Sequence, residues 1–312
     1  MKIITITLNP AFDVHYKVPG LKLLKQSYAT EVVKHAGGKG VNISRTLSFN
    51  GVENVSVCVL AVGGGDEFLN SLKGDNLNCI PIYTDGRIRE NITLHSNDGE
   101  TRISCEGFAI NKEILTSVLK SIEKEMQKDT IVTFTGRLND GITNCDAIEL
   151  LQKIKKLGAK LIVDCNSFTA DDLIKIKPYL IKPNEQEISE LLGAELNSVN
   201  DVCEIAKKLV SDGVENVIIS LGAKGFVFCN KNCLKLVNVP KITPVSTIGA
   251  GDSTIAGFIA GMASSMEIDN VLKLSAAFGT AACLAEGTNP PDKTDIERIY
   301  KDVRVTNINF KK

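Results

Sequence analysis

The strongest constraint on the fold is a regular alternation of buried-strand patterns and helical patterns along most of this 312-residue chain. Short apolar runs bounded by glycine, asparagine or aspartate predict strands at Ile3–Leu8, Val55–Val62, Thr130–Phe134, Leu161–Asp164, Leu180–Lys182 and Val217–Leu221. Apolar residues at spacings of three and four predict helices at Asn111–Met126, Cys145–Leu157 and Val199–Ser211. Strands that alternate with helices form a mostly parallel sheet with helices on both faces. We therefore expect an α/β fold.

Two segments break this alternation and predict pairs of strands instead. Apolar and polar residues alternate within residues 12–36 and 87–108, and Asn97-Asp98-Gly99 is a favourable hairpin turn. Together the two pairs predict one small sheet outside the main one. Because ligands bind beyond the carboxyl ends of parallel strands, this sheet would form a lid over a ligand site. We expect residues 1–312 to form a single domain that consists of the α/β core and this lid.

Composition argues against several classes of protein. The 36 basic and 37 acidic side chains give a formal charge of −1, so no overall field favours nucleic acid or an anionic membrane. The chain contains no apolar run of about 18 residues that would span a bilayer, and its start does not fit a signal peptide. The nine cysteines are odd in number and include no CxxC pair, which predicts reduced thiols and a cytoplasmic protein.

A glycine cluster near the C-terminus carries the clearest chemical signal. It reads Thr247-Ile-Gly-Ala-Gly-Asp252 and precedes a run of small residues at helical spacing. Gly249 and Gly251 allow a sharp turn that directs backbone N–H groups, together with the helix N-terminus, at one point. This arrangement predicts an anion hole. Asp252 beside it fits two roles equally well from spacing alone, a helix cap or a base that takes a proton from an attacking hydroxyl.

A second glycine cluster, Gly37-Gly38-Lys39-Gly40, also precedes a predicted helix. It is not a Walker A loop, because the chain contains no GxxxxGK[ST] sequence. By itself it fits an ordinary turn between a strand and a helix. Asn42, one step inside the helix, would offer its amide to a polyol.

Two further patterns follow predicted strands. In Lys182-Pro-Asn-Glu-Gln-Glu187 the spacing places Asn184 and Glu187 on one helix face, which suits either a capping pattern or water-mediated magnesium. In Ser220-Leu-Gly-Ala-Lys-Gly225 the glycines would allow nucleotide phosphates to approach the backbone.

Taken together, these clusters resemble the ribokinase-like (PfkB) family of carbohydrate kinases across essentially the whole chain. The resemblance rests on the ordered combination of TLNPAFD, GGKGVN, KPNEQE, SLGAKG and TIGAGD. The first two motifs are similar to those of the branch that phosphorylates sugar phosphates, namely 1-phosphofructokinase and tagatose-6-phosphate kinase. The resemblance implies a ribokinase-like fold, ATP and Mg²⁺ as cofactors, and a sugar phosphate as the small-molecule partner.

The expected reaction is the ATP-dependent conversion of fructose 1-phosphate to fructose 1,6-bisphosphate. Tagatose 6-phosphate remains an alternative substrate that sequence does not separate from fructose 1-phosphate. A non-catalytic sugar-phosphate sensor is a second alternative, although a binding protein has no need of a base beside an anion hole. A dehydrogenase is disfavoured because no G-x-G-x-x-G follows the first strand.

The resemblance also implies a role for each matching residue. Asp252 would be the catalytic base, and Gly249, Ala250 and Gly251 would hold the transferring phosphoryl group through backbone N–H groups. Sugar hydroxyls would be bound by Asp13, Gly38 and Asn42, and the phosphate of the substrate would face Lys39 and Arg89. Asn184 and Glu187 would organise magnesium through water, and the residues expected to bind ATP are Lys182, Asn184, Ser220, Gly222 and Gly225.

Two departures from the family pattern introduce arginine. Arg137 stands in GRLN where relatives read GSLP, and Arg102 stands in TRIS where relatives read TEIN. Either arginine would supplement the grip on phosphate and shift substrate preference, or would form a surface ion pair. We also expect a homodimer through the lid, because lid strands with an exposed apolar face favour pairing.

Overall fold

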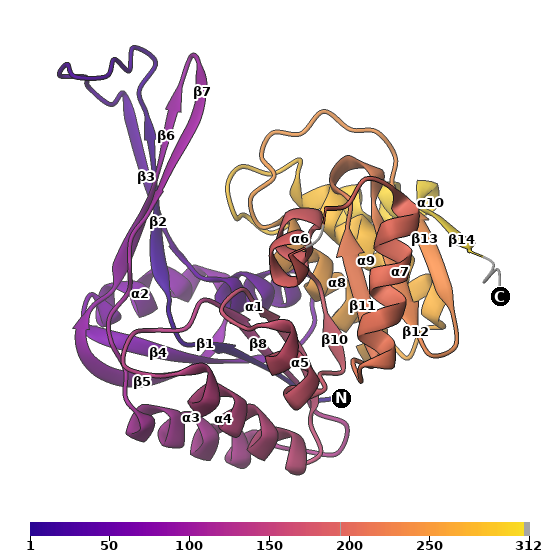
Figure 1. Cartoon of the computed structure of the whole chain (residues 1–312). Helices are drawn as coiled ribbons and strands as arrows, with labels where there is room; N and C mark the ends of the chain where they lie inside the picture. The colour runs from indigo at the N-terminus through magenta and orange to yellow at the C-terminus, as the bar shows by residue number, and fades with distance from the viewer. Residues whose placement is uncertain (194, 309–312) are drawn as a thin grey trace.

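The computed structural model describes residues 1–193 and 195–308, and these form two β-sheets and the helices around them (Figure 1). The large sheet has the order β14-β13-β12-β11-β10-β9-β8-β1-β4-β5. Its strands are β1 (Ile3–Thr7), β4 (Val55–Gly63), β5 (Asn78–Arg87), β8 (Ile131–Gly136), β9 (Lys160–Cys165), β10 (Leu180–Ile181), β11 (Asn216–Ser220), β12 (Phe226–Asn230), β13 (Leu234–Asn238) and β14 (Arg304–Asn307).

Most of the large sheet is parallel, as the alternation of strands and helices predicts. Every pairing from β5 across to β11 is parallel, and β12, β13 and β14 then continue the sheet as antiparallel strands. The carboxyl ends of the parallel strands therefore lie at one edge of the sheet, where polar residues that follow those strands come together.

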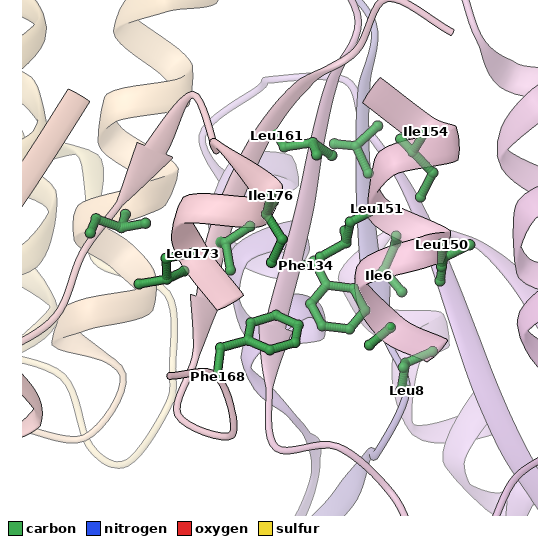
Figure 2. Close-up of a cluster of buried hydrophobic side chains, with 14 of the residues drawn as sticks. Ile6, Leu8, Phe134, Leu150, Leu151, Ile154, Leu161, Phe168, Leu173 and Ile176 are labelled. Atoms are coloured by element: carbon green, nitrogen blue, oxygen red, sulfur yellow. The ribbon is translucent and has the colours of Figure 1, made fainter. Parts of the chain in front are cut away.

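Helices cover both faces of this sheet, and each face has its own apolar core. The helices are α1 (Lys39–Phe49), α2 (Gly65–Leu72), α3 (Lys112–Glu125), α4 (Asn144–Lys156), α5 (Ala170–Ile176), α6 (Glu185–Leu192), α7 (Val199–Ser211), α8 (Ala250–Ala263), α9 (Ile268–Ala282) and α10 (Lys293–Asp302). Residues of α1, α8, α9 and α10 form the core on one face, and residues of α2, α3, α4 and α7 belong to the core on the other. Figure 2 shows part of this second core, where Phe134 of β8 packs near Phe168 with ring centroids 5.8 Å apart.

The small sheet has the order β3-β2-β6-β7, with strands β2 (Ala11–Lys17), β3 (Glu31–Gly37), β6 (Arg89–Ser96) and β7 (Gly99–Ser104). Its four strands rise away from the large sheet (Figure 1). The two predicted strand pairs are confirmed as antiparallel hairpins, and β2 and β6 join them in parallel, with Asp13 opposite Asn91. Near the base of this sheet, Phe12 packs edge-on against Phe68 of α2, with ring centroids 5.6 Å apart.

The predicted strands and helices are present with boundaries that differ by one or two residues. The strand predicted to extend to Lys182 ends at Ile181, because Pro183 has no backbone N–H and restricts the residue before it. The strand β5, the hairpin β12–β13 and the strand β14 are not predicted by the sequence patterns. No helix within the described residues is long and apolar enough to cross a membrane.

Candidate active site

Two glycine-capped helices begin at the edge of the large sheet where the parallel strands end. The N-cap of α1 is Gly38, with φ of 122°, and the N-cap of α8 is Gly249, with φ of 76°. Both angles lie in the region that glycine adopts without steric cost. A Cβ atom on Gly40 would lie 2.4 Å from Oγ1 of Thr7. The start of α1 is therefore packed directly on β1.

Asp252 lies in the first turn of α8, is only 6% exposed, and forms no helix cap. Its Oδ2 instead accepts a hydrogen bond of 2.9 Å from Nδ2 of Asn42 in α1. Burial raises the pKa of this carboxyl to about 6, although the charge of Lys39 and the bond from Asn42 act in the opposite direction. A buried carboxylate with a pKa near neutrality suits a general base. The helix-cap role that spacing left open is not observed.

Asp164 and two lysines complete the charged group around Asp252. Nζ of Lys39 lies 3.0 Å from Oδ2 of Asp164, the residue before the last of β9. Burial would raise the pKa of Asp164, but the ammonium groups of Lys182 and Lys39 hold it below its usual value. A Cβ atom on Gly251 would lie 2.9 Å from Nζ of Lys182. Both ammonium groups are therefore held beside the N-terminus of α8.

Asp164 was not among the site residues predicted from the sequence, although a signal for it was present. It is a charged residue at the carboxyl end of a predicted buried strand, where β9 pairs Asp164 with Thr135 of β8. At 8% exposure, an unpaired carboxylate would be costly there, so the residue required nearby cations.

Lys39 is the site residue whose position differs most from expectation. It was predicted to face the substrate phosphate together with Arg89. Burial lowers the pKa of Lys39, but the charges of Asp164, Asp252 and Glu187 raise it overall, so these carboxylates surround it. The groups that act on Arg89 are different ones, Asp13 and Arg137 among them. Lys39 lies near these three carboxylates because it follows Gly38 directly at the start of α1.

On the small sheet, Asp13 lies on β2 next to Asn91 of β6. Its Oδ1 accepts a hydrogen bond of 3.0 Å from Nδ2 of Asn91, and a Cβ atom on Gly37 would lie 2.2 Å from its Oδ2. Within the described residues, five buried asparagines have an amide oxygen with no hydrogen-bond partner, namely Asn9, Asn42, Asn54, Asn91 and Asn139. Those of Asn9, Asn42 and Asn91 lie on the segment before β2, on α1 and on β6. Buried polar atoms are normally paired. These oxygens fit the hydroxyl groups of a polyol.

Arg89 begins β6 and is anchored through its guanidinium group. It donates to the backbone oxygens of Cys105 at 2.9 Å and Asn9 at 3.2 Å, while its Nε is buried without a partner. Arg137 lies in the same hollow as Arg89. Arg102 lies elsewhere, opposite Thr93 on β7, where its charge acts on His15.

Asn184 and Glu187 form a capping box at the start of α6. The amide oxygen of Asn184 accepts from the backbone N–H of Glu187 at 2.8 Å, and Oε2 of Glu187 accepts from the backbone N–H of Asn184 at 2.9 Å. The box uses Oε2 of Glu187, and within residues 1–193 and 195–308 Oε1 has no hydrogen-bond partner and is available for a hydrated cation. Glu187 is also close enough to act on Lys39. One carboxylate oxygen fits Mg²⁺, which retains several waters and binds phosphates. Asn184 thus orients Glu187, and its own amide oxygen is already engaged.

The predicted nucleotide residues lie on neighbouring strand ends. Ser220 ends β11 and forms a parallel bridge with Asn184, so both lie next to the strand end that carries Lys182. Gly222 and Gly225 form the turn into β12, with φ of 56° and 101°. A Cβ atom on Gly225 would lie 1.9 Å from the backbone oxygen of Val237, so only glycine fits.

Two cavities lie near the small sheet and the strand ends, and the first of them borders the charged group. One of about 280 Å³ is lined by Asp164, Lys182, Glu187 and the segment between β9 and α5. The other, of about 260 Å³, lies between the small sheet and the loops before α8 and after α9. All three histidines of the chain line this second cavity, and Nδ1 of His15 lies 3.0 Å from Nε2 of His95.

The fold, together with the two helices that begin with a glycine cap at the edge of the large sheet, defines an α/β kinase of the ribokinase-like class. Escherichia coli phosphofructokinase-2, solved in complex with substrates and products, shares the fold with a TM-score of 0.90 at 24% identity, over 97% of this chain and 99% of that one. A crystal structure of a Staphylococcus aureus protein matches with a TM-score of 0.82 at 29% identity, over 98% of this chain and 99% of that one. The predicted fold class is confirmed.

The chain belongs to the pfkB family of carbohydrate kinases, whose model matches residues 8–295. It is 32% identical to 1-phosphofructokinase of Borreliella burgdorferi, over 98% of this chain and 99% of that protein. It is 29% identical to 1-phosphofructokinase of Bacillus subtilis, over 98% of this chain and the whole of that protein. The resemblance inferred from the motifs is confirmed, and the protein is a sugar kinase of a family that uses ATP, usually with Mg²⁺.

Proposed function

We propose that this kinase transfers the γ-phosphoryl group of ATP to fructose 1-phosphate and releases fructose 1,6-bisphosphate and ADP. The observation that carries the proposal is the position of Asp252. A buried carboxylate with a raised pKa lies in the first turn of a glycine-capped helix, next to two ammonium groups. Such a group combines a base with cations that stabilise a transferring phosphoryl group.

Asp252 acts as the general base. Its carboxylate takes the proton of the C6 hydroxyl while that oxygen forms a bond to the γ-phosphorus. The bond between the γ-phosphorus and the β–γ bridging oxygen breaks, and its electron pair leaves with ADP. Asn42 orients the carboxylate through the 2.9 Å hydrogen bond to Oδ2 and leaves the other oxygen available for the hydroxyl.

The developing negative charge meets positive groups from three elements. The first turn of α8 presents the backbone N–H groups of Gly251 and Asp252, which have no partner within the helix, whereas the N–H of Ala250 donates to the backbone oxygen of Thr247 at 3.4 Å. Lys182 reaches Gly251 from the end of β10, and Lys39 reaches Asp164 from α1. Because Lys39 is held by the buried carboxylate of Asp164, it needs no large rearrangement during the reaction.

Mg²⁺ bound with ATP would neutralise charge on the nucleotide phosphates. The residue suited to hold it is Glu187, through the carboxylate oxygen that the capping box leaves free, with Asn184 fixing the carboxylate from the other side. Lys182, Ser220, Gly222 and Gly225 would line the nucleotide.

The choice of acceptor rests on the curated relatives, which are named 1-phosphofructokinase. Asp13 and the unpartnered amide oxygens of Asn9, Asn42 and Asn91 are suited to bind sugar hydroxyls. The small sheet would act as a lid that excludes water, whose attack on ATP would waste the nucleotide.

We also propose that residues 1–312 form a single domain and that two copies pair through the small sheet. Phe12 and Val14 are buried at the base of one face of this sheet, but farther out on the same face Val32 is 54% exposed and Ile103 is 48% exposed. The free cysteines suit a reducing compartment, and we place the protein in the cytoplasm.

The test is a coupled ADP-release assay with a panel of sugars and sugar phosphates. We expect the highest kcat/KM with fructose 1-phosphate and a requirement for Mg²⁺. Tagatose 6-phosphate is assayed beside it. A higher kcat/KM with tagatose 6-phosphate would reject the proposed substrate, and no ADP release with any acceptor would reject the kinase reaction.

A further inference from the structure

The three histidines of the chain lie on one face of the small sheet. His15 is on β2, His35 is on β3 opposite Asp13, and His95 is on β6. Residues two apart in a strand, and residues opposite each other in neighbouring strands, share a face, so the register places all three histidines on the face that carries Asp13. They line the cavity of about 260 Å³ between this sheet and the loops before α8 and after α9.

Two of these histidines are in direct contact. Nδ1 of His15 lies 3.0 Å from Nε2 of His95, and the ring planes differ by only 22°. On the other side of the ring, Nδ1 of His95 lies 3.2 Å from Oε1 of Glu100, the residue opposite it on β7. Because a carboxylate only accepts hydrogen bonds, Nδ1 of His95 carries the ring proton and Nε2 presents a lone pair toward His15.

This arrangement has the parts of a metal site. A histidine that binds a metal almost always donates its other ring N–H to a carboxylate, a carbonyl or water, as His95 does to Glu100. Two imidazole nitrogens on one tetrahedral Zn²⁺ ion, with Zn–N bonds of about 2.0–2.1 Å, lie about 3.3 Å apart. The observed separation of 3.0 Å is close to this value. Small rotations about χ2, a torsion with broad minima, would direct both nitrogens at one ion.

The His15 ring is in the protonation state that a metal requires. Burial is the largest influence that lowers the pKa of His15, and the charge of His95 acts in the same direction. Asp13 raises this pKa, whereas His35 and Arg102 lower it. The net effect is a lowered pKa, so the ring is neutral at neutral pH and its nitrogens are available as ligands.

The cavity carries more negative than positive charge. Among the described residues, its lining includes the carboxylates of Glu31, Glu100 and Glu286 and one lysine, Lys17. No group of three or more His, Cys, Asp or Glu side chains in residues 1–193 and 195–308 is arranged to hold a metal ion. The protein therefore supplies two ligands, and the cavity has room for the waters that would complete the coordination.

We propose that His15 and His95 bind a divalent transition metal ion, represented by Zn²⁺, and that Glu100 orients His95 for this purpose. The ion replaces the hydrogen bond between the two rings. His15 then binds through Nδ1, and its ring proton moves to Nε2, which lies beside Gly287 of the loop after α9. Imidazole favours zinc, copper and nickel, whereas Mg²⁺ favours oxygen ligands, so the site does not compete for the Mg²⁺ of ATP.

NMR spectroscopy of protein labelled with ¹⁵N-histidine and prepared without a histidine tag tests the site. The chain has three histidines, so three sets of ring signals are expected, and single His→Gln variants assign them. Adding Zn²⁺ should change the ring signals of His15 and His95, and the titration gives Kd. We expect Glu100→Gln to raise Kd for Zn²⁺ about tenfold, and His15→Gln or His95→Gln to raise it about 100-fold or more.

Glu31→Gln is the matched control for Glu100→Gln. It removes the same charge from the same cavity, at a carboxylate that lies 3.9 Å from Nζ of Lys17. His35→Gln is the control for the two ligand variants, because it removes the third histidine of the cavity. Both controls should leave Kd for Zn²⁺ nearly unchanged.

Two results would overturn the inference. One is Zn²⁺ binding that leaves the ring signals of His15 and His95 unchanged, as binding to the exposed thiols of Cys105 and Cys145 would do. The other is a loss of affinity in Glu31→Gln or His35→Gln as large as that in the variants of the proposed site. Neither result depends on ATP or on turnover, so the metal site and the proposed kinase reaction are tested separately.

Discussion

Asn42 and Asp252 are 210 residues apart in the sequence, and a hydrogen bond of 2.9 Å from Nδ2 to Oδ2 joins them. The bond connects the first turns of α1 and α8, the two helices that begin with a glycine cap at the edge of the large sheet. It places an amide donor on a carboxylate that burial otherwise drives toward its protonated form. The catalytic proposal therefore depends on a contact between the two glycine clusters.

Replacement of Asp252 by asparagine removes the base and keeps the size of the side chain. We expect kcat to fall about 10²- to 10⁴-fold with little change in KM, because general-base catalysis is lost while the ground-state contacts remain. The measurement is steady-state ADP release with fructose 1-phosphate. Asp171→Asn, at an exposed position of α5, is the control and should retain full activity. A kcat near that of wild type in Asp252→Asn would contradict the mechanism.

The pH dependence of kcat/KM reports the ionisation of Asp252. The pKa of about 6 means that activity falls as the pH drops through that value, because the carboxylate must be free of its proton to act as a base. In Asn42→Ala the hydrogen bond that lowers this pKa is absent, so the acid limb should move to higher pH. Asn54→Ala, a buried asparagine that bonds to Ser44 and Ser48, is a structural control whose acid limb should stay in place.

The same residue links activity to stability. A carboxyl with a pKa raised on folding binds its proton more tightly in the native state, so its charged form opposes folding above about pH 6. Asp252→Asn removes this buried charge, and we expect it to stabilise the fold at pH 8 by about 1–3 kcal/mol. The gain should shrink as the pH falls below 6. Thermal unfolding of wild type and Asp252→Asn, measured at pH 8 and at a pH below 6, gives the difference in stability. A Tm of the variant below that of wild type at pH 8 would contradict the account.

Gly251→Ala tests the placement of Lys182. The new Cβ atom would meet only the ammonium end of that side chain, at 2.9 Å for Nζ and 3.3 Å for Cε, so the lysine moves and the backbone does not. We expect kcat to fall about tenfold, the cost of about 1.4 kcal/mol of lost stabilisation, with no loss of thermal stability. Gly74→Ala, where no atom lies within 4 Å, is the matched control. Loss of folding in Gly251→Ala would show that the added Cβ atom disturbs more of the structure than the side chain of Lys182.

Charges on the outer part of the small sheet test the proposed dimer. Val32 and Ile103 lie on the same face of β3 and β7, and both are about half exposed. We expect wild type to sediment as a dimer and the double variant Val32→Glu, Ile103→Lys to sediment as a monomer, because two charges on an apolar interface oppose pairing. Phe49→Lys, at an exposed position of α1, is the control. A wild-type monomer at micromolar concentration would reject the dimer.

The sequence predicted the parts of the fold that depend on local pattern. Apolar runs, helical spacing and the Asn97-Asp98-Gly99 turn were sufficient for the parallel strands other than β5, for several helices and for both hairpins of the small sheet. The strand β14, with the sequence RVTN, carries too little pattern in four residues and forms because β13 offers it a partner edge. The antiparallel strands β12 and β13 were missed for a similar reason, since pairing rather than periodicity defines them.

The site was predicted less completely than the fold. Motifs indicated Asp252, Asn42 and Glu187, but spacing does not show which side chains meet across the sheet. Lys39 turned out to pair with Asp164, because β9 places that carboxylate at the strand end next to the start of α1. Such contacts depend on strand order, which local sequence does not determine.

The parallel pairing of β2 with β6 has a consequence for how the protein is made. When the ribosome has released the β2–β3 hairpin, the strand that will lie beside Asp13 is still more than 50 residues from synthesis, with α1, β4, α2 and β5 to come first. An isolated hairpin is marginally stable in water. We therefore expect the nascent chain to form β4 and β5 before the proposed sugar-binding surface exists. A chain arrested before Arg89 would contain Asp13 but not Asn91, the β6 residue to which it is hydrogen-bonded.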